Sequence, residues 1–68
     1  MGIKQTFGQK VNALRKGKGL SQEDLSEKSG INRPYISAIE QGKRNVSLEV
    51  MEKLAEALEI HIKVLFEE

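Results

Sequence analysis

The stretch QEDLSEKSGINRPYISAIEQ, residues 22–41, decides the fold of this chain of 68 residues. It predicts two short amphipathic helices, at about 22–28 and 33–40, that meet at Gly30. Because glycine adopts the left-handed backbone conformation at little cost, the first helix is expected to end there. Ser26 is small enough to let the two helices approach closely, and four apolar residues are expected to pack between them: Leu25, Ile31, Ile36 and Ile39.

Polar residues at the start of each expected helix support this prediction. Ser21 is expected to cap the first helix, with Asp24 at the third helical position as its partner in a capping box. Asn32 is expected to cap the second helix. Two caps, a glycine stop and four apolar anchors within about twenty residues are typical of a helix-turn-helix.

A further helix is expected before this motif. Thr6 followed by Gln9 resembles a capping box, and Gly17 should end the helix. Three apolar residues at helical spacing form its expected inner face: Phe7, Val11 and Leu14.

The chain after the motif predicts two more helices and no strand. Gly42 should end the second helix of the motif, and Ser47 should cap the next helix, at about 48–58. The expected inward residues of that helix are Leu48, Met51, Leu54, Ala55 and Leu58. A short fifth helix is expected at about 61–66. The chain is therefore predicted to be one all-α domain, residues 1–68, with a single core.

The stretches GLSQEDL and SGINRPYISAIEQGKRN resemble the helix-turn-helix family of the lambda-type phage repressors and Cro. The resemblance continues through SLEVMEKLAEALEI, the fourth helix of that family, and so covers nearly the whole chain. RPYIS followed by QGKRN is most similar to the small controller proteins of restriction-modification systems. Two positions depart from the family pattern: Ser26 stands where alanine is usual, and Pro34 takes a position that often carries a polar reader. The resemblance implies a compact five-helix, lambda-repressor-like fold that binds double-stranded DNA.

Charge is distributed unevenly along the chain. Residues 1–46 hold nine Lys or Arg against four Asp or Glu, a net charge of +5, whereas residues 47–68 hold two against six, a net charge of −4. One interpretation is ordinary solvated helix faces. The other is a basic DNA-binding face on the first three helices with an acidic face behind it, and the motif favours this one.

Several other functions lack the residues that they need. The chain has no cysteine and one histidine, His61, so a metal site has too few ligands. No serine or acid pair has a partner at catalytic spacing, and no glycine-rich phosphate loop appears. We therefore expect no enzyme, metal, cofactor or small-molecule ligand.

The composition also bears on location. The first residues, MGIKQT, lack the apolar run of a signal peptide, and no stretch approaches the roughly 20 apolar residues of a membrane span. A soluble, cytoplasmic protein without a membrane partner is expected.

The second helix of the motif is expected to enter the major groove, where each base pair presents a distinct set of donors and acceptors. Arg33, at its start, is expected to contact a guanine; the alternatives are a phosphate contact or a solvated side chain. Ala38 could touch a thymine methyl group, and Pro34 could stiffen the helix start or contact an apolar base edge. The expected outward face comprises Arg33, Pro34, Ser37, Ala38 and Gln41.

Phosphate contacts are expected on both sides of this helix. Tyr35 could donate to a phosphate or lean against a base, and a place in the core is the alternative. Gln22 resembles the family glutamine that meets a phosphate at a helix start, where the dipole favours an anion. The family places the following loop, Lys43, Arg44 and Asn45, against the DNA backbone. The alternatives are that Arg44 reads a base or that this is an ordinary basic surface loop.

Arg15 and Glu40 match family positions that form a largely buried ion pair between the first helix and the end of the recognition helix. We expect a structural role for this pair. The apolar residues near the C-terminus are expected to pair two subunits within residues 46–66, through Val50, Ile62, Val64, Leu65 and Phe66. A place in the core of the monomer is the alternative for Ile62, Leu65 and Phe66, as it is for Ile60. A symmetric dimer would place two recognition helices about 34 Å apart, one turn of DNA.

The sequence thus predicts a homodimeric, sequence-specific DNA-binding transcription regulator, and the narrower resemblance implies a restriction-modification controller protein. The alternatives are a phage-type repressor, a DNA-binding antitoxin, or a protein-interaction module that kept this fold and lost DNA. The last alternative has no need of Gln22, Arg33 or the basic loop.

Overall fold

The computed structural model describes residues 2–67, which form four α-helices, one short 3-10 helix and no strand. In chain order these are α1 (Ile3–Gly17), α2 (Gln22–Ser29), α3 (Arg33–Glu40), α4 (Leu48–Leu58) and the 3-10 helix η1 (Ile62–Phe66). The all-α prediction is confirmed for these residues. Residues 1 and 68 of the predicted domain lie outside the described part of the chain.

The prediction of five α-helices is wrong, because the last segment is a 3-10 helix of five residues. Helix α4 ends where Glu59 takes the left-handed conformation, with a φ of 57°. In η1 the amide of Val64 donates to the carbonyl of His61, three residues back. So short a segment offers few of the i to i−4 bonds that stabilise an α-helix, and the tighter 3-10 turn takes its place.

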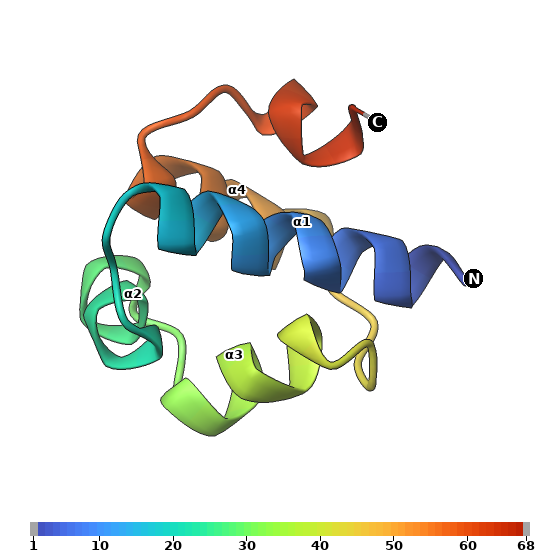
Figure 1. Ribbon diagram of the computed structural model, residues 1–68, viewed down its shortest axis with the longest axis horizontal. Coiled ribbons are helices and arrows are strands. Elements are labelled where there is room, and N and C mark those ends of the chain that lie inside the picture. Colours follow the sequence, from blue (N-terminus) through green and yellow to red (C-terminus); the bar gives the residue numbers. More distant parts are fainter. Residues whose placement is uncertain (1, 68) are drawn as a thin grey trace.

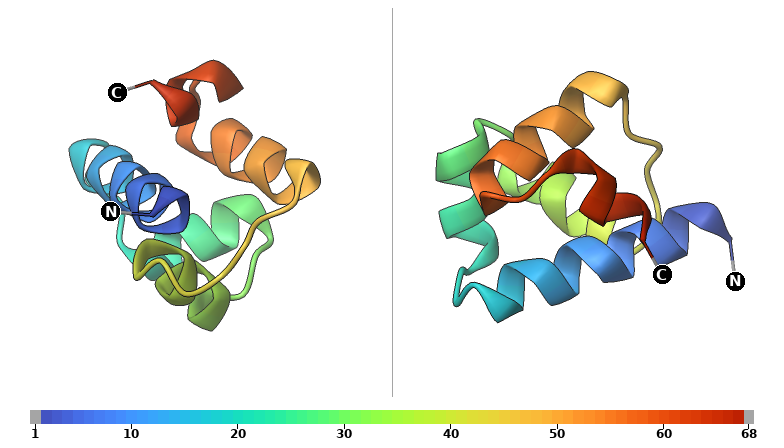
Figure 2. Two further views of the ribbon diagram at one scale, coloured as in Figure 1. Left: turned by 90° about the vertical axis from the view of Figure 1, so that its right-hand side faces the viewer. Right: turned by 90° about the horizontal axis from the view of Figure 1, so that it is seen from above.

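Helix α1 crosses the middle of the molecule in Figure 1 and lies in front of α4 in that view. Helices α2 and α3 lie on one side of α1, and η1 lies on the opposite side (Figures 1 and 2). Helix α1 packs against α3 and η1, and α4 packs against α2 and η1. As a result, α3 lies at the outer edge of the bundle.

The core is formed by residues from all five helical segments and from the turn after α2. Its fully buried side chains are Val11, Leu25, Ile36, Ile39, Leu54 and Leu58. The prediction that Leu48 points into this core is wrong, because 75% of Leu48 is exposed. Leu48 lies one turn before Met51 on the same face, but it is the first residue of α4, and its exposure means that no neighbouring element within residues 2–67 covers it there.

The caps of the motif helices differ from one another. Ser21 and Asp24 form the expected capping box, in which each side chain accepts from the other's backbone N–H at 2.9 Å. Asn32 makes no side-chain cap bond, contrary to expectation. Pro34 at the second helical position has no N–H to donate, and the N–H of Tyr35 is taken by the carbonyl of Asn32.

The other helix ends are set by hydrogen bonds and backbone conformations of the residues beside them. Helix α1 begins before Thr6, so the capping box predicted there is wrong: Gln5 instead accepts a hydrogen bond from the backbone N–H of Gly2. Gly30 ends α2 in the left-handed conformation, as predicted, with a φ of 75°. Ser47 caps α4 by accepting from the N–H of Val50 at 3.1 Å. Within residues 2–67, none of the helices has the length and apolar character that crossing a membrane requires.

Candidate nucleic-acid interface

Helix α3 has one buried face and one face that is open to solvent. Ile36 and Ile39 are buried, whereas Arg33, Pro34 and Gln41 are exposed. Ser37 and Ala38 are half-buried between these two faces. The Nε2 atom of Gln41 donates to the hydroxyl of Ser37 at 3.0 Å, so these two predicted contacts form one small polar unit.

Tyr35 connects α3 to the loop that follows it. Its hydroxyl donates to the carbonyl of Asn45 at 3.3 Å, and the guanidinium of Arg44 lies 4.8 Å from the centre of its ring. The tyrosine is half-buried and packs against the edge of the core, so its position lies between the two alternatives open from the sequence. Arg44 is held by a cation–π contact, while Lys43 and Asn45 are also exposed beside it.

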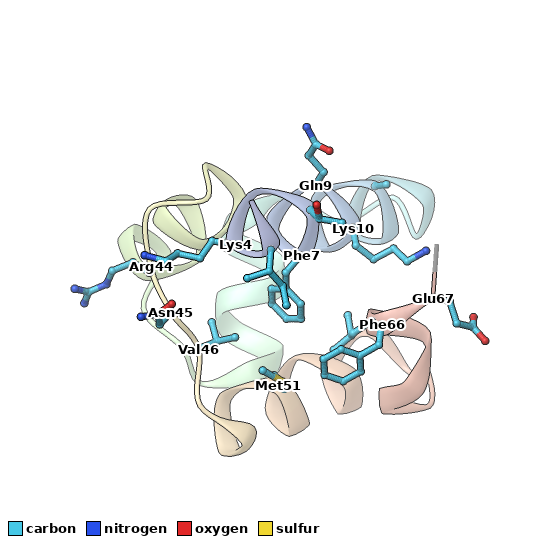
Figure 3. A pocket seen from close by; sticks show the side chains of 14 residues that line it. Lys4, Phe7, Gln9, Lys10, Arg44, Asn45, Val46, Met51, Phe66 and Glu67 are labelled. Atoms are coloured by element: carbon cyan, nitrogen blue, oxygen red, sulfur yellow. The ribbon is translucent and has the colours of Figure 1, made fainter. Parts of the chain in front are cut away.

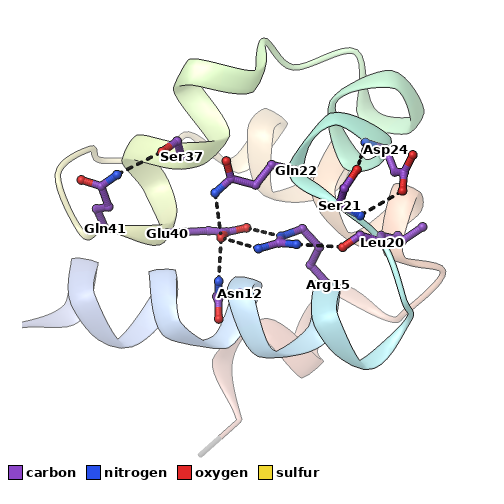
Figure 4. Close-up of polar contacts among 9 residues, drawn as sticks. All are labelled: Asn12, Arg15, Leu20, Ser21, Gln22, Asp24, Ser37, Glu40 and Gln41. Atoms are coloured by element: carbon purple, nitrogen blue, oxygen red, sulfur yellow. Dashed lines mark hydrogen bonds and ion pairs between the residues drawn. The ribbon is translucent and has the colours of Figure 1, made fainter.

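Glu40, at the end of α3, is the centre of a buried polar network (Figure 4). Its carboxylate accepts from Arg15 twice, through Nε at 2.8 Å and Nη2 at 3.1 Å. The same carboxylate accepts from Asn12 at 2.8 Å and from Gln22 at 3.1 Å. Arg15 also donates to the carbonyl of Leu20 at 2.7 Å, just before the cap of α2.

The ion pair of Arg15 and Glu40 is shielded from solvent, because the two side chains are only 10% and 4% exposed. Burial by itself raises the pKa of Glu40, but the hydrogen bonds from Arg15, Asn12 and Gln22 together lower it below its ordinary value. The hydrogen bond to Glu40 raises the pKa of Arg15. Both groups are therefore charged, and each stabilises the other.

Asn12 is a member of this network that the sequence analysis missed. It lies one turn before Arg15 on α1, and residues three apart share a helix face. The spacing of Asn12 and Arg15 could therefore have indicated a second polar side chain directed at Glu40. Gln22 was expected to face a phosphate; here its amide nitrogen is directed inward to Glu40.

The residues expected to pair two subunits differ in exposure. Leu65 is buried in the core of the subunit, with 3% of its surface exposed. Val50, Ile62 and Val64 are half-buried, and Phe66 is 57% exposed. The sequence analysis assigned no surface role to Ile3, which is 84% exposed.

Phe66 borders an apolar groove of about 500 Å³ between α1, η1 and the loop before α4. Figure 3 shows the side chains of Phe7, Phe66, Val46 and Met51 directed toward one another across this groove. The rings of Phe7 and Phe66 lie 6.4 Å apart between centroids. Three basic side chains also line the groove: Lys4, Lys10 and Arg44.

His61 has a local role at the start of η1. Its Nδ1 atom accepts from the backbone N–H of Lys63 at 3.1 Å. Across residues 2–67, no group of three His, Cys, Asp or Glu side chains is arranged to hold a metal ion.

The fold and the arrangement of α2 and α3 define a class of protein. Residues 11–65 match the model of the helix-turn-helix family, and the chain belongs to that family. It is 46% identical over 66 residues to the control protein C.BamHI of Bacillus amyloliquefaciens, covering 96% of this chain and 82% of the relative. It is 48% identical to the control protein C.MunI of Mycoplasma sp, covering 94% of this chain and 88% of the relative.

Solved structures agree with these relatives. The crystal structure of the restriction-modification controller protein C.AhdI from Aeromonas hydrophila matches with a TM-score of 0.91 and 49% identity, over 93% of this chain and 96% of that one. The controller protein C.Esp1396I, solved as a tetramer in complex with its natural 35 base-pair operator, matches with a TM-score of 0.89 and 33% identity, over 97% and 87% of the two chains. The similar proteins are thus regulators rather than enzymes.

Proposed function

We propose that this chain is a sequence-specific DNA-binding regulator of transcription, of the restriction-modification controller type. The observation that carries the proposal is the presentation of α3, which buries Ile36 and Ile39 and leaves Arg33 and Gln41 exposed at the edge of the bundle. A helix presented in this way fits the major groove of B-form DNA. The similarity to a controller protein solved on its operator supports the same function.

Each predicted contact residue then has a role that its chemistry allows. Arg33 reads guanine through the paired O6 and N7 acceptors, and Ala38 contacts a thymine methyl group. Pro34 stiffens the start of the helix, and Ser37 and Gln41 act together through their hydrogen bond. The remaining residues hold the DNA backbone: Gln22, Tyr35, Lys43, Arg44 and Asn45.

Selection of binding sites from random duplex DNA at about 150 mM salt tests this function. The parent should enrich a two-fold symmetric motif, and Arg33→Ala should lose or relax the motif at one position in each half-site. Arg33 is exposed, so this substitution should leave the fold unchanged by circular dichroism. Weak binding that disappears with salt, without an enriched motif, would mean that the chain does not read sequence.

We further propose that the functional unit is a homodimer. A roughly palindromic operator requires two copies of α3 about 34 Å apart. The exposed apolar side chains of Ile3 and Phe66, together with the groove that they line, supply an apolar surface that a second copy can cover. This surface extends beyond the residues predicted from the sequence, because it includes α1.

Sedimentation without DNA tests the dimer. The parent should sediment as a dimer at micromolar concentration, and Phe66→Glu should sediment as a monomer because a carboxylate would be buried in the apolar contact. A parent that is monomeric at about 100 micromolar, a concentration at which even weak pairs associate, would exclude this dimer. Circular dichroism of Phe66→Glu must match the parent for the comparison to hold.

A further inference from the structure

Glu40 joins three helices through one side chain. It belongs to α3, and it accepts hydrogen bonds from Asn12 and Arg15 of α1 and from Gln22 of α2. Its Oε1 atom alone accepts from three donors, and the Glu40 side chain is 4% exposed. The network therefore fixes the start of α2 relative to the end of α3.

The chemistry of this contact sets the orientation of the Gln22 amide. An ionised carboxylate accepts hydrogen bonds and cannot donate them. The NH2 group of Gln22 must therefore face Glu40, since the opposite orientation would place two acceptor oxygens together without a proton between them. One N–H of Gln22 is used in this bond, and the second N–H and the amide oxygen remain.

Gln22 occupies a position where an anion is favoured. It is the first residue of α2, and its backbone N–H is one of those that the helix leaves without an internal partner. A phosphate accepts hydrogen bonds only, so the side chain of Gln22 can meet it solely through the second N–H of its amide. An amide that rotates freely would present its oxygen to the phosphate for part of the time.

We propose that Glu40 is a positioning residue for Gln22, which holds the amide so that its free N–H is presented to a DNA phosphate. The inference rests on the proposed function, because it concerns a DNA contact of the same surface. Phosphate contacts set the orientation of a protein on the duplex, and base contacts specify the sequence. Glu40 is carried by the helix that reads bases, so one carboxylate couples the two kinds of contact.

A double-mutant cycle on the selected duplex tests this role. Glu40→Gln should weaken DNA binding by about fivefold to tenfold, the effect of one hydrogen bond, when Gln22 is present. In the Gln22→Ala background the same substitution should cause no further loss. Asn12→Ala is the matched control, since it removes another donor from the same oxygen and should change the affinity by less than about twofold.

Equal losses in both backgrounds, or no loss in either, would overturn the inference and leave Glu40 a purely structural residue. If the Glu40→Gln variant does not fold, a variant that carries both Arg15→Met and Glu40→Met takes its place in the cycle. Replacing both members of a buried ion pair by apolar residues of similar volume is often tolerated, because no charge is left unpaired.

Side-chain amide exchange by NMR provides a test on the free protein. The Gln22 amide proton that is donated to Glu40 should exchange at least about tenfold more slowly than the amide protons of Gln9, an exposed glutamine, because it is hydrogen-bonded and shielded. Equal exchange would overturn the inference. The two proposals fail separately: a parent that binds no duplex refutes the proposed function, whereas a parent that binds DNA with an unprotected Gln22 amide refutes only the role of Glu40.

Discussion

The two ends of α3 are held in opposite ways. At the C-terminal end, Glu40 is buried among donors from α1 and α2, and the backbone passes so close to Gly8 of α1 that no side chain fits between them. At the N-terminal end, Arg33 and Pro34 are exposed and no side chain caps the helix. One end is therefore an anchor, and the other is free to meet a ligand.

This difference indicates that the two ends of the eight-residue helix α3 have different roles, one in stability and the other in binding. Substitutions at the anchored end should act on the free energy of unfolding, because they disturb buried and satisfied contacts. Substitutions at the free end should act on DNA binding and leave stability nearly unchanged. The free energy of unfolding of a small domain is small. Adding or removing even a single side-chain atom at the anchored end should therefore lower it measurably.

The largest effect is expected from Arg15→Ala, which leaves Glu40 buried without its charged partner. The free energy of unfolding should fall by about 3 to 5 kcal/mol, enough to unfold much of the protein. Lys53→Ala is the control, since it removes an exposed pair with Glu49 at 3.8 Å and should cost under about 1 kcal/mol. Chemical denaturation of both variants measures the difference. An unchanged midpoint for Arg15→Ala would mean that the ion pair does not anchor the C-terminal end of α3.

The next effect is expected from Gly8→Ala. A Cβ atom at this position would collide with the carbonyl oxygen of Ile39 and would lie 2.9 Å from that of Glu40. Helix α1 must therefore move away from the end of α3, at a cost of about 2 to 3 kcal/mol. Gly17→Ala is the matched control on the same helix, because nothing lies within 4 Å of its Cβ position. Similar melting temperatures for the two variants would show that the close approach of α1 and α3 is not required.

The pH dependence of stability should also report on the anchored end. The pKa of Glu40 is lower in the folded protein than in the unfolded chain, whose value is about 4.3. Its contribution is therefore fully present above about pH 4.3 and is lost as the pH falls through the folded pKa, with a slope of at most about 1.4 kcal/mol per pH unit. Denaturation between about pH 3 and 6 should show a smaller slope in Glu40→Gln. Identical slopes would mean that Glu40 is not linked to folding.

The features that the sequence predicted well are those fixed by neighbouring residues. The capping box of Ser21 and Asp24, the left-handed stop at Gly30 and the cap at Ser47 depend on contacts within a few positions. The bounds of α3 and α4 agree with the prediction for the same reason. The Arg15 and Glu40 pair spans 25 positions, and it was found through the family resemblance rather than from spacing.

The features that the sequence did not predict depend on how helices are placed in space. Leu48 has the spacing of a core residue, but it stands at the first position of α4, where no neighbouring element of the described chain covers it. Gly8 has no local role and is required only because α3 ends against it. The groove beside Phe66 is likewise formed by segments from both ends of the chain. Such features need the packed structure, since hydrophobic period alone does not show where a neighbouring element ends.

The smallest effects on the free energy of unfolding are expected from substitutions at the N-caps of α2 and α3. Ser21→Ala removes a side-chain bond to the N–H of Asp24 and should cost about 1 kcal/mol. Asn32→Ala removes no cap bond at the start of α3 and should change the free energy of unfolding by less than about 0.5 kcal/mol. Thermal melting of the two variants beside the parent measures this difference. An equal loss for Asn32→Ala would indicate that its side chain does cap α3 in solution, and the reading end of the helix would then be anchored too.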